Sequence, residues 1–167
     1  MKRYIVIGLI AVFILYVVPL LLVCVFQRRL MYFPPDVYLA PDAVNLVQAQ
    51  EVSRTIATGD SITGWWLPPE SADGTVVMFF HGNGSAVYSN HDIYRDLHER
   101  GYGVYGVGYV GYPGSSGLPN QADIVAGAIE QYDWVLAQGN APENIVFYGT
   151  SLGSGIAAQL ALERRPA

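Results

Sequence analysis

The sequence predicts an α/β fold with a mostly parallel sheet, preceded by one membrane helix. Three observations lead to this prediction. Residues 4–26 form an uncharged apolar segment. After residue 50, apolar runs typical of buried strands alternate with segments of helical periodicity. Finally, Ser151 stands between two nearby glycines where the last predicted strand meets the last predicted helix.

The apolar segment is long enough to cross a membrane. As a helix it spans about 35 Å, whereas the hydrocarbon core of a bilayer is about 30 Å thick. We therefore expect residues 1–29 to be an uncleaved, single-pass N-terminal anchor. A cleaved signal peptide is the alternative, because Lys2 and Arg3 precede the segment, but no small-residue cleavage site follows it. The flanking charges slightly favour a cytoplasmic N-terminus, which would place the domain outside the cytoplasm.

The rest of the chain is acidic. After Arg29 there are five arginines and fourteen acidic residues, a net charge of −9. Such a surface repels phosphate backbones, so we expect no nucleic-acid partner. The single cysteine, Cys24, lies in the apolar segment, and no spacing of histidine, cysteine or carboxylate residues resembles a metal site. We expect neither a disulfide framework nor a cofactor, and the oligomeric state stays open.

A linker and a hairpin follow the anchor. Residues 30–50 contain Pro34 and Pro35, which oppose helix continuation, and are expected to form a linker. Alternating apolar residues then predict a β-hairpin over residues 51–67. Its two adjacent tryptophans fit core or edge packing better than a ligand platform.

Residues 75–80 predict an apolar strand that leads into His81-Gly82-Asn83-Gly84. An oxyanion loop needs such a sequence, because its backbone N–H groups must approach a substrate oxygen without side chains in between. The alternative is a glycine turn beside a buried histidine. In combination with the serine turn we favour the oxyanion loop.

Two further helices and one strand complete the middle of the chain. A helix is expected from Asn90, as possible N-cap, to the residue before Gly101, and its His91 and His98 are expected to be solvated rather than catalytic. A strand over residues 102–107 follows. The next ten residues form a glycine-rich loop with two tyrosines, which either lines a pocket or only turns corners. Helical periodicity then covers residues 120–138.

The last strand and helix flank the serine. Four apolar residues, 145–148, suit a parallel strand covered on both faces. Gly149-Thr150-Ser151-Leu152-Gly153 fits the nucleophile elbow, in which Gly149 and Gly153 leave room for a strained turn. Residues 154–164 are small and Ala/Leu-rich, as in a helix. Alternatively, the motif is a tight turn without chemistry.

These motifs together resemble the α/β-hydrolase superfamily, and within it the membrane-anchored, serine-aminopeptidase-like hydrolases. The resemblance covers about residues 28–165. It rests on four motifs in the right order: the membrane helix followed by Arg-Arg-Leu-Met-Tyr-Phe-Pro, then His81-Gly-Asn-Gly84, Gly111-Tyr-Pro-Gly-Ser-Ser-Gly117 and Gly149-Thr-Ser-Leu-Gly153.

The resemblance implies roles for matching residues. Ser151 would be the nucleophile, and the backbone N–H groups of Leu152 and Asn83 would form the oxyanion hole. A serine in place of an aspartate favours acyl transfer over epoxide or haloalkane chemistry. The implied reaction is cleavage of an ester, thioester or amide in a small-molecule, lipid or peptide acyl substrate through an acyl-enzyme. This sequence departs from the family at one motif. Relatives usually carry Asp-Tyr-Arg-Gly-Tyr-Gly there, whereas this chain has Gly108 in place of the aspartate and Val110 in place of the arginine.

The family's triad is incomplete in this sequence. An acid and then a histidine should follow the nucleophile, but the sixteen residues after Ser151 include no histidine. We therefore expect the N-terminal part of a longer enzyme, truncated after the nucleophile-elbow helix, with a partial α/β-hydrolase domain at 51–167. Such a chain would be nearly inactive. The alternative is a non-catalytic, membrane-tethered binding or scaffold protein on a degenerate hydrolase fold.

Overall fold

The computed structural model describes residues 2–164. Residues 165–167, the end of the predicted domain, lie outside the described part. The chain forms two units that divide between Phe33 and Pro34. We describe each unit by itself.

The first unit is built on one long helix, α1 (Lys2–Met31). Its most apolar stretch has a mean hydropathy of 3.1, and none of that stretch is buried in protein. Thirty helical residues measure about 45 Å, so α1 is long and apolar enough to cross a bilayer. An N-terminal signal sequence would share these properties. Arg28 and Arg29 lie in its last turn, where positive charge complements the helix dipole.

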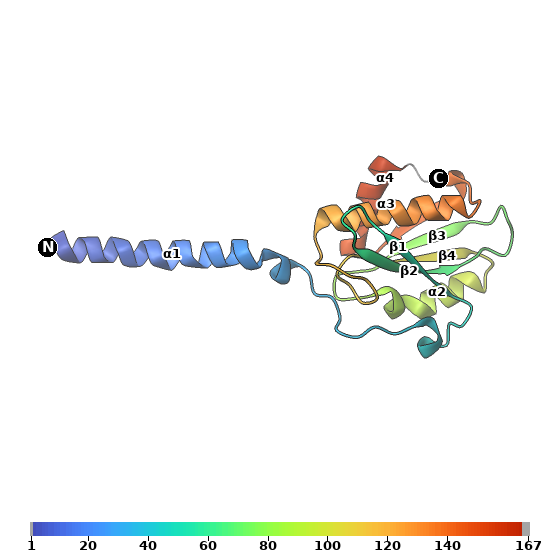
Figure 1. The fold of residues 1–167 in the computed structure, drawn as a ribbon, viewed down its shortest axis with the longest axis horizontal. Coiled ribbons are helices and arrows are strands. Elements are labelled where there is room, and N and C mark those ends of the chain that lie inside the picture. Colours follow the sequence, from blue (N-terminus) through green and yellow to red (C-terminus); the bar gives the residue numbers. More distant parts are fainter. Residues whose placement is uncertain (1, 165–167) are drawn as a thin grey trace. The chain divides into compact units, whose positions relative to one another are not determined.

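The second unit contains a five-stranded mixed sheet in the order β1-β2-β4-β3-β5 (Figure 1). The predicted hairpin is present, because β1 (Gln50–Thr55) pairs antiparallel with β2 (Ser61–Leu67). β2 also runs antiparallel to β4 (Gly103–Val107). β3 (Val76–Phe80) is parallel to both β4 and β5 (Ile145–Gly149). The parallel part of the sheet thus lies at β4-β3-β5.

Helices cover the sheet on two sides. Figure 1 shows α2 (His91–His98) on one face, with α3 (Gln121–Ala137) and α4 (Leu152–Glu163) on the other. α2 contacts β4, whereas α4 contacts β3 and β5. Three short 3₁₀ helices connect elements: η1 (Pro41–Val44), η2 (Val87–Asn90) and η3 (Pro142–Asn144).

Apolar side chains from β2, β3, β4 and α2 form the core under α2. Trp65 and Phe79 are fully buried there. The ring of Tyr94 meets Phe79 edge-on, with centroids 5.3 Å apart. Trp66 is also buried and meets Trp134 edge-on on the α3 side of the sheet. Both hairpin tryptophans therefore pack in the interior, as predicted.

β5 differs from the prediction that both of its faces are covered. Ile145 is buried, but Val146 is 44% and Tyr148 51% exposed. α4 packs on one face of β5, and α2 reaches β4 rather than β5 on the other. Within residues 2–164, β5 pairs with β3 alone and forms an edge of the sheet.

Candidate active site

Ser151 occupies a strained turn between β5 and α4. Its backbone angles are φ 50° and ψ −118°, and among residues 2–164 only Asn45 is another non-glycine residue with positive φ. A side chain in such a region costs of order 1–3 kcal/mol, which the surrounding structure must offset. Ser151 is exposed at this turn. A sharp strand-to-helix turn is thus present where the motif predicts one.

The turn requires glycine at both flanking positions of the motif, because no side chain fits at either. A Cβ on Gly149 would lie 2.6 Å from the carbonyl oxygen of Gly153. A Cβ on Gly153 would lie 2.1 Å from the carbonyl oxygen of Phe80. Both obstacles are backbone atoms, which cannot rotate away. Helix α4 can therefore start directly beside the end of β3.

The predicted oxyanion loop, residues 81–84, lies next to Ser151. The backbone N–H of Thr150 donates to the carbonyl oxygen of Phe80 at 3.0 Å, which joins the elbow to the end of β3. A Cβ on Gly82 would stand 3.6 Å from the Cβ of Ser151, whereas one on Gly84 would meet open space. The structure thus brings the two predicted motifs together.

His81 is a buried structural residue of this loop. Its side chain is completely buried, and its Nδ1 lies 2.9 Å from the carbonyl oxygen of Gly82. Because that carbonyl can only accept, Nδ1 must carry the proton. Burial lowers the pKa of His81 to about 4, although the hydrogen bond to Gly82 opposes this shift. The ring is therefore neutral at neutral pH, with an Nε2 that has no hydrogen-bond partner in the described chain.

Two tyrosines from the glycine-rich loop after β4 hold the oxyanion loop. The Tyr109 hydroxyl donates to the carbonyl oxygen of His81 at 2.9 Å. The Tyr112 hydroxyl donates to Oδ1 of Asn83 at 2.7 Å. The Tyr109 ring also packs on the His81 ring, with centroids 4.0 Å apart. The sequence alone did not distinguish a pocket-lining loop from one that only reverses the chain. It also did not predict these contacts, because they join residues 28 and 29 positions apart.

The start of the same loop explains the departure at Gly108. A Cβ there would lie 2.0 Å from the carbonyl oxygen of Thr63, so this backbone position excludes a side chain. Buried Gln131 on α3 accepts from the Gly108 N–H and donates to its carbonyl oxygen, both at 2.9 Å. No sequence pattern distinguishes Gln131 from a solvated glutamine of an amphipathic helix.

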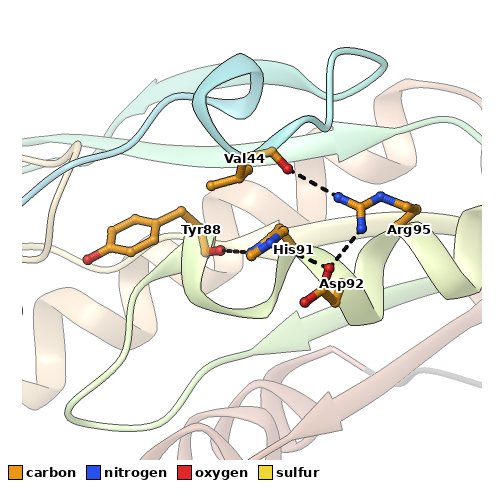
Figure 2. Close-up of polar contacts among 5 residues, drawn as sticks. All are labelled: Val44, Tyr88, His91, Asp92 and Arg95. Carbon is orange, nitrogen blue, oxygen red and sulfur yellow. Dashed lines mark hydrogen bonds and ion pairs between the residues drawn. The ribbon is translucent and has the colours of Figure 1, made fainter.

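His91 is engaged at the start of α2, on the other face of the sheet from α4. Its Nδ1 lies 2.9 Å from the Tyr88 carbonyl oxygen, and its Nε2 lies 3.4 Å from Oδ1 of Asp92 (Figure 2). Arg95 pairs with the same carboxylate at 2.7 Å and donates to the Val44 carbonyl oxygen at 3.1 Å. This cluster ties α2 to the preceding segment of the chain, and its contacts are structural.

His98 and Asn90 lie at opposite ends of α2. His98 is half-buried, with Nδ1 3.4 Å from the Tyr102 carbonyl oxygen. Asn90 precedes the helix as predicted, but its side chain makes no capping bond. It donates instead to the Ser85 hydroxyl at 3.3 Å.

The arrangement offers an exposed hydroxyl beside a helix start. Leu152 is the first residue of α4, and the first N–H groups of a helix have no acceptor within it. They carry partial positive charge, which suits a developing anion near Ser151. Among residues 2–164, no three histidine, cysteine or carboxylate side chains gather into a metal-binding group.

Comparison with known families agrees with this geometry. The sequence profile of the alpha/beta hydrolase fold family matches residues 75–166, which is more than half of the chain. This chain belongs to the α/β-hydrolase fold family. The match includes β3, the oxyanion loop and the elbow.

Curated relatives extend the match to the N-terminal part of this α/β-hydrolase. The Mycobacterium tuberculosis protein Rv2307c is 32% identical over 144 residues, covering 84% of this chain and 51% of its own length. Escherichia coli YfhR is 27% identical over 127 residues, covering 73% of this chain and 44% of its own. The chain thus spans about half the length of the curated relatives that it matches.

Solved structures share the fold. An alpha-beta hydrolase from Vibrio vulnificus superposes with a TM-score of 0.63 at 27% identity, over 75% of this α/β-hydrolase and 45% of that chain. A Pyrococcus furiosus esterase gives a TM-score of 0.65 at 19% identity, over 81% and 52% of the two chains. A Vigna radiata epoxide hydrolase gives 0.56 at 19% identity, over 70% and 35%. At these identities the last two show the fold alone.

Proposed function

We propose that this protein is a serine hydrolase whose nucleophile is Ser151. The observation that carries the proposal is the strained backbone of Ser151 at the junction of β5 and α4. A connecting turn gains nothing from a non-glycine residue at positive φ, whereas a nucleophile gains an exposed, fixed hydroxyl. Membership of the α/β-hydrolase fold family supports the same assignment.

In this proposal the reaction is acyl transfer. A general base takes the proton of the Ser151 hydroxyl while its oxygen attacks the carbonyl carbon of an ester, thioester or amide, and the leaving group departs with a proton from a general acid. Water then hydrolyses the acyl-enzyme. The backbone N–H groups of Leu152 and Asn83 receive the charge on the tetrahedral oxygen. Support comes from Leu152 at the start of α4 and from Gly82, the neighbour of Asn83, beside Ser151.

We propose that the general base, and the acidic residue that orients it, lie outside residues 2–164. His81 is buried and neutral, and the contacts of His91 and His98 described above lie within and around α2. The match covers only about half of each relative, and the remaining half could supply both groups. In studied triads, loss of the serine or histidine lowers turnover by about 10⁶.

Helix α1 is part of the proposal as a membrane anchor. Its apolar length and the absence of burial along its most apolar stretch support a single span. The domain would then act beside a lipid surface, on a small-molecule, lipid or peptide acyl substrate. The flanking charges favour a cytoplasmic N-terminus only slightly.

The test is covalent labelling of the protein expressed from its complete native gene, in native membranes. A fluorophosphonate probe should label the wild type, and peptide mapping should place the adduct on Ser151. Ser151→Ala should abolish labelling. Ser154→Ala is the matched control, because Ser154 is an exposed serine one turn further along α4 whose hydroxyl donates to the Gly149 carbonyl oxygen. Unchanged labelling of Ser151→Ala would refute the assignment, and ligand binding unaffected by that change would favour the scaffold alternative.

A further inference from the structure

We propose that Tyr112 is a positioning residue of the oxyanion hole, which it orders through the side chain of Asn83. This inference rests on the proposed function, because it concerns the same site. It assigns a role to the glycine-rich loop, residues 108–117, that neither the motif nor the fold of this α/β-hydrolase provides.

The contact itself is well placed for this role. The Tyr112 hydroxyl donates to Asn83 Oδ1 at 2.7 Å, and the tyrosine side chain is 2% exposed. Asn83 is the residue whose backbone N–H is proposed to receive the substrate oxygen. An oxyanion donor is effective only if its direction is fixed before the charge develops. A hydrogen bond to the asparagine side chain restrains rotation of this residue in an otherwise glycine-flanked loop.

Tyr109, three residues before Tyr112, also contacts the oxyanion loop. Its hydroxyl donates to the carbonyl oxygen of His81, and its ring lies 5.4 Å from that of Tyr112 in an edge-on contact. The His81 ring packs against both tyrosine rings, with centroids 4.0 and 5.3 Å away. The two phenols therefore hold the oxyanion loop at two points, one on each side of Gly82.

The tyrosines can hold another loop because their own loop is anchored at both ends. Gln131 fixes its start by pairing with both backbone groups of Gly108. Near its end, Ser115 accepts from the N–H of Thr63 at 3.0 Å. The N–H of Ser116 donates to the Ser61 carbonyl oxygen at 2.8 Å. The loop is thus fastened to α3 at one end and to β2 at the other, which makes it a rigid support.

Tyr112→Phe removes the hydroxyl and keeps the ring, so it is the central variant. In the protein expressed from its complete native gene, the rate at which fluorophosphonate labels Ser151 should fall by about tenfold to a hundredfold, because a misplaced reacting group slows a reaction by this order. With an activated ester, kcat should fall while KM stays unchanged, because the lost interaction acts on the transition state. Tyr105→Phe is the matched control, since Tyr105 is buried and its hydroxyl has no hydrogen-bond partner in the described chain.

A double-mutant cycle separates positioning from general destabilisation. Asn83→Ala should slow labelling, and adding Tyr112→Phe to it should slow labelling no further, because both changes remove the same contact. A further loss of the same size in the Asn83→Ala background would overturn the inference. So would an unchanged labelling rate in Tyr112→Phe alone.

Hydrogen exchange keeps this inference distinguishable from the proposed function. Amides of residues 82–85 should exchange faster in Tyr112→Phe than in Tyr105→Phe, whether or not Ser151 reacts. Absence of Ser151 labelling in the wild type would refute the function and leave this positional result standing. Equal exchange in the two variants would overturn the inference even if Ser151 is labelled.

Discussion

Thr150 donates its backbone N–H to the carbonyl oxygen of Phe80 at 3.0 Å, and this bond helps to join the turn at Ser151 to the strand that precedes the predicted oxyanion loop. The same carbonyl oxygen is the atom that a Cβ on Gly153 would meet. Ser151 and the predicted oxyanion loop therefore meet at one small backbone junction, and its tolerance of added atoms can be measured.

Gly153→Ala should destabilise the protein. The added Cβ would lie 2.1 Å from the Phe80 oxygen, so α4 or β3 must shift at a cost of about 1–3 kcal/mol or more. Urea unfolding of the full chain in detergent, followed by tryptophan fluorescence, measures the change. The control is Gly155→Ala on the same helix, where a Cβ meets nothing within 4 Å. It should stabilise by about 0.5–1 kcal/mol, and equal effects at both positions would contradict the packing.

His81 should make stability depend on pH. Its folded pKa of about 4 lies below the ordinary 6.5, so the unfolded state binds a proton more readily between these values. The free energy of unfolding should therefore fall by about 3 kcal/mol as pH falls from about 6.5 to 4, with no further loss from this group below pH 4. His81→Phe should remove this contribution. His98→Gln should retain it, and an identical pH profile in wild type and His81→Phe would show that His81 is not buried as described.

Gln131→Leu should be costly although it replaces a polar residue by an apolar one of similar size. It leaves the N–H and the carbonyl oxygen of Gly108 without the partner that pairs both. Each unsatisfied buried group costs about 1–3 kcal/mol, so we expect a loss of about 2–4 kcal/mol in urea unfolding. Gln138→Leu is the control, because Gln138 is exposed beyond the end of the same helix. A small effect at position 131 would mean that water replaces the side chain.

Local sequence signals were sufficient to predict most elements and the positions of the turns at residues 81–84 and 149–153. Ser151, Gly149 and Gly153 are recognisable because the strained turn imposes its residue types within five positions. The loop at residues 81–84 is recognisable because glycines flank Asn83 directly after an apolar strand. These residue types stand close together in the sequence, although the atom that excludes a side chain at Gly153 belongs to the distant Phe80.

Contacts between distant segments were not predictable in the same way. Tyr112 and Asn83 meet because β3 and β4 are adjacent and parallel, so the loops after them emerge at the same edge of the sheet. The topology was expected, but which side chains would meet there depends on rotamers and loop geometry. Burial of Val146 and Tyr148 was predicted wrongly because their apolar character cannot reveal whether a helix reaches that face.

The outer side of β5 has a practical consequence for anyone who purifies this polypeptide. Among residues 2–164 the outer edge of β5 pairs with no strand, and its main-chain groups, beside the exposed Val146 and Tyr148, form a template to which another extended segment can add. Concentrated samples should therefore self-associate even when detergent shields α1. Val146→Lys would place a charge beside these groups and should keep such samples dispersed.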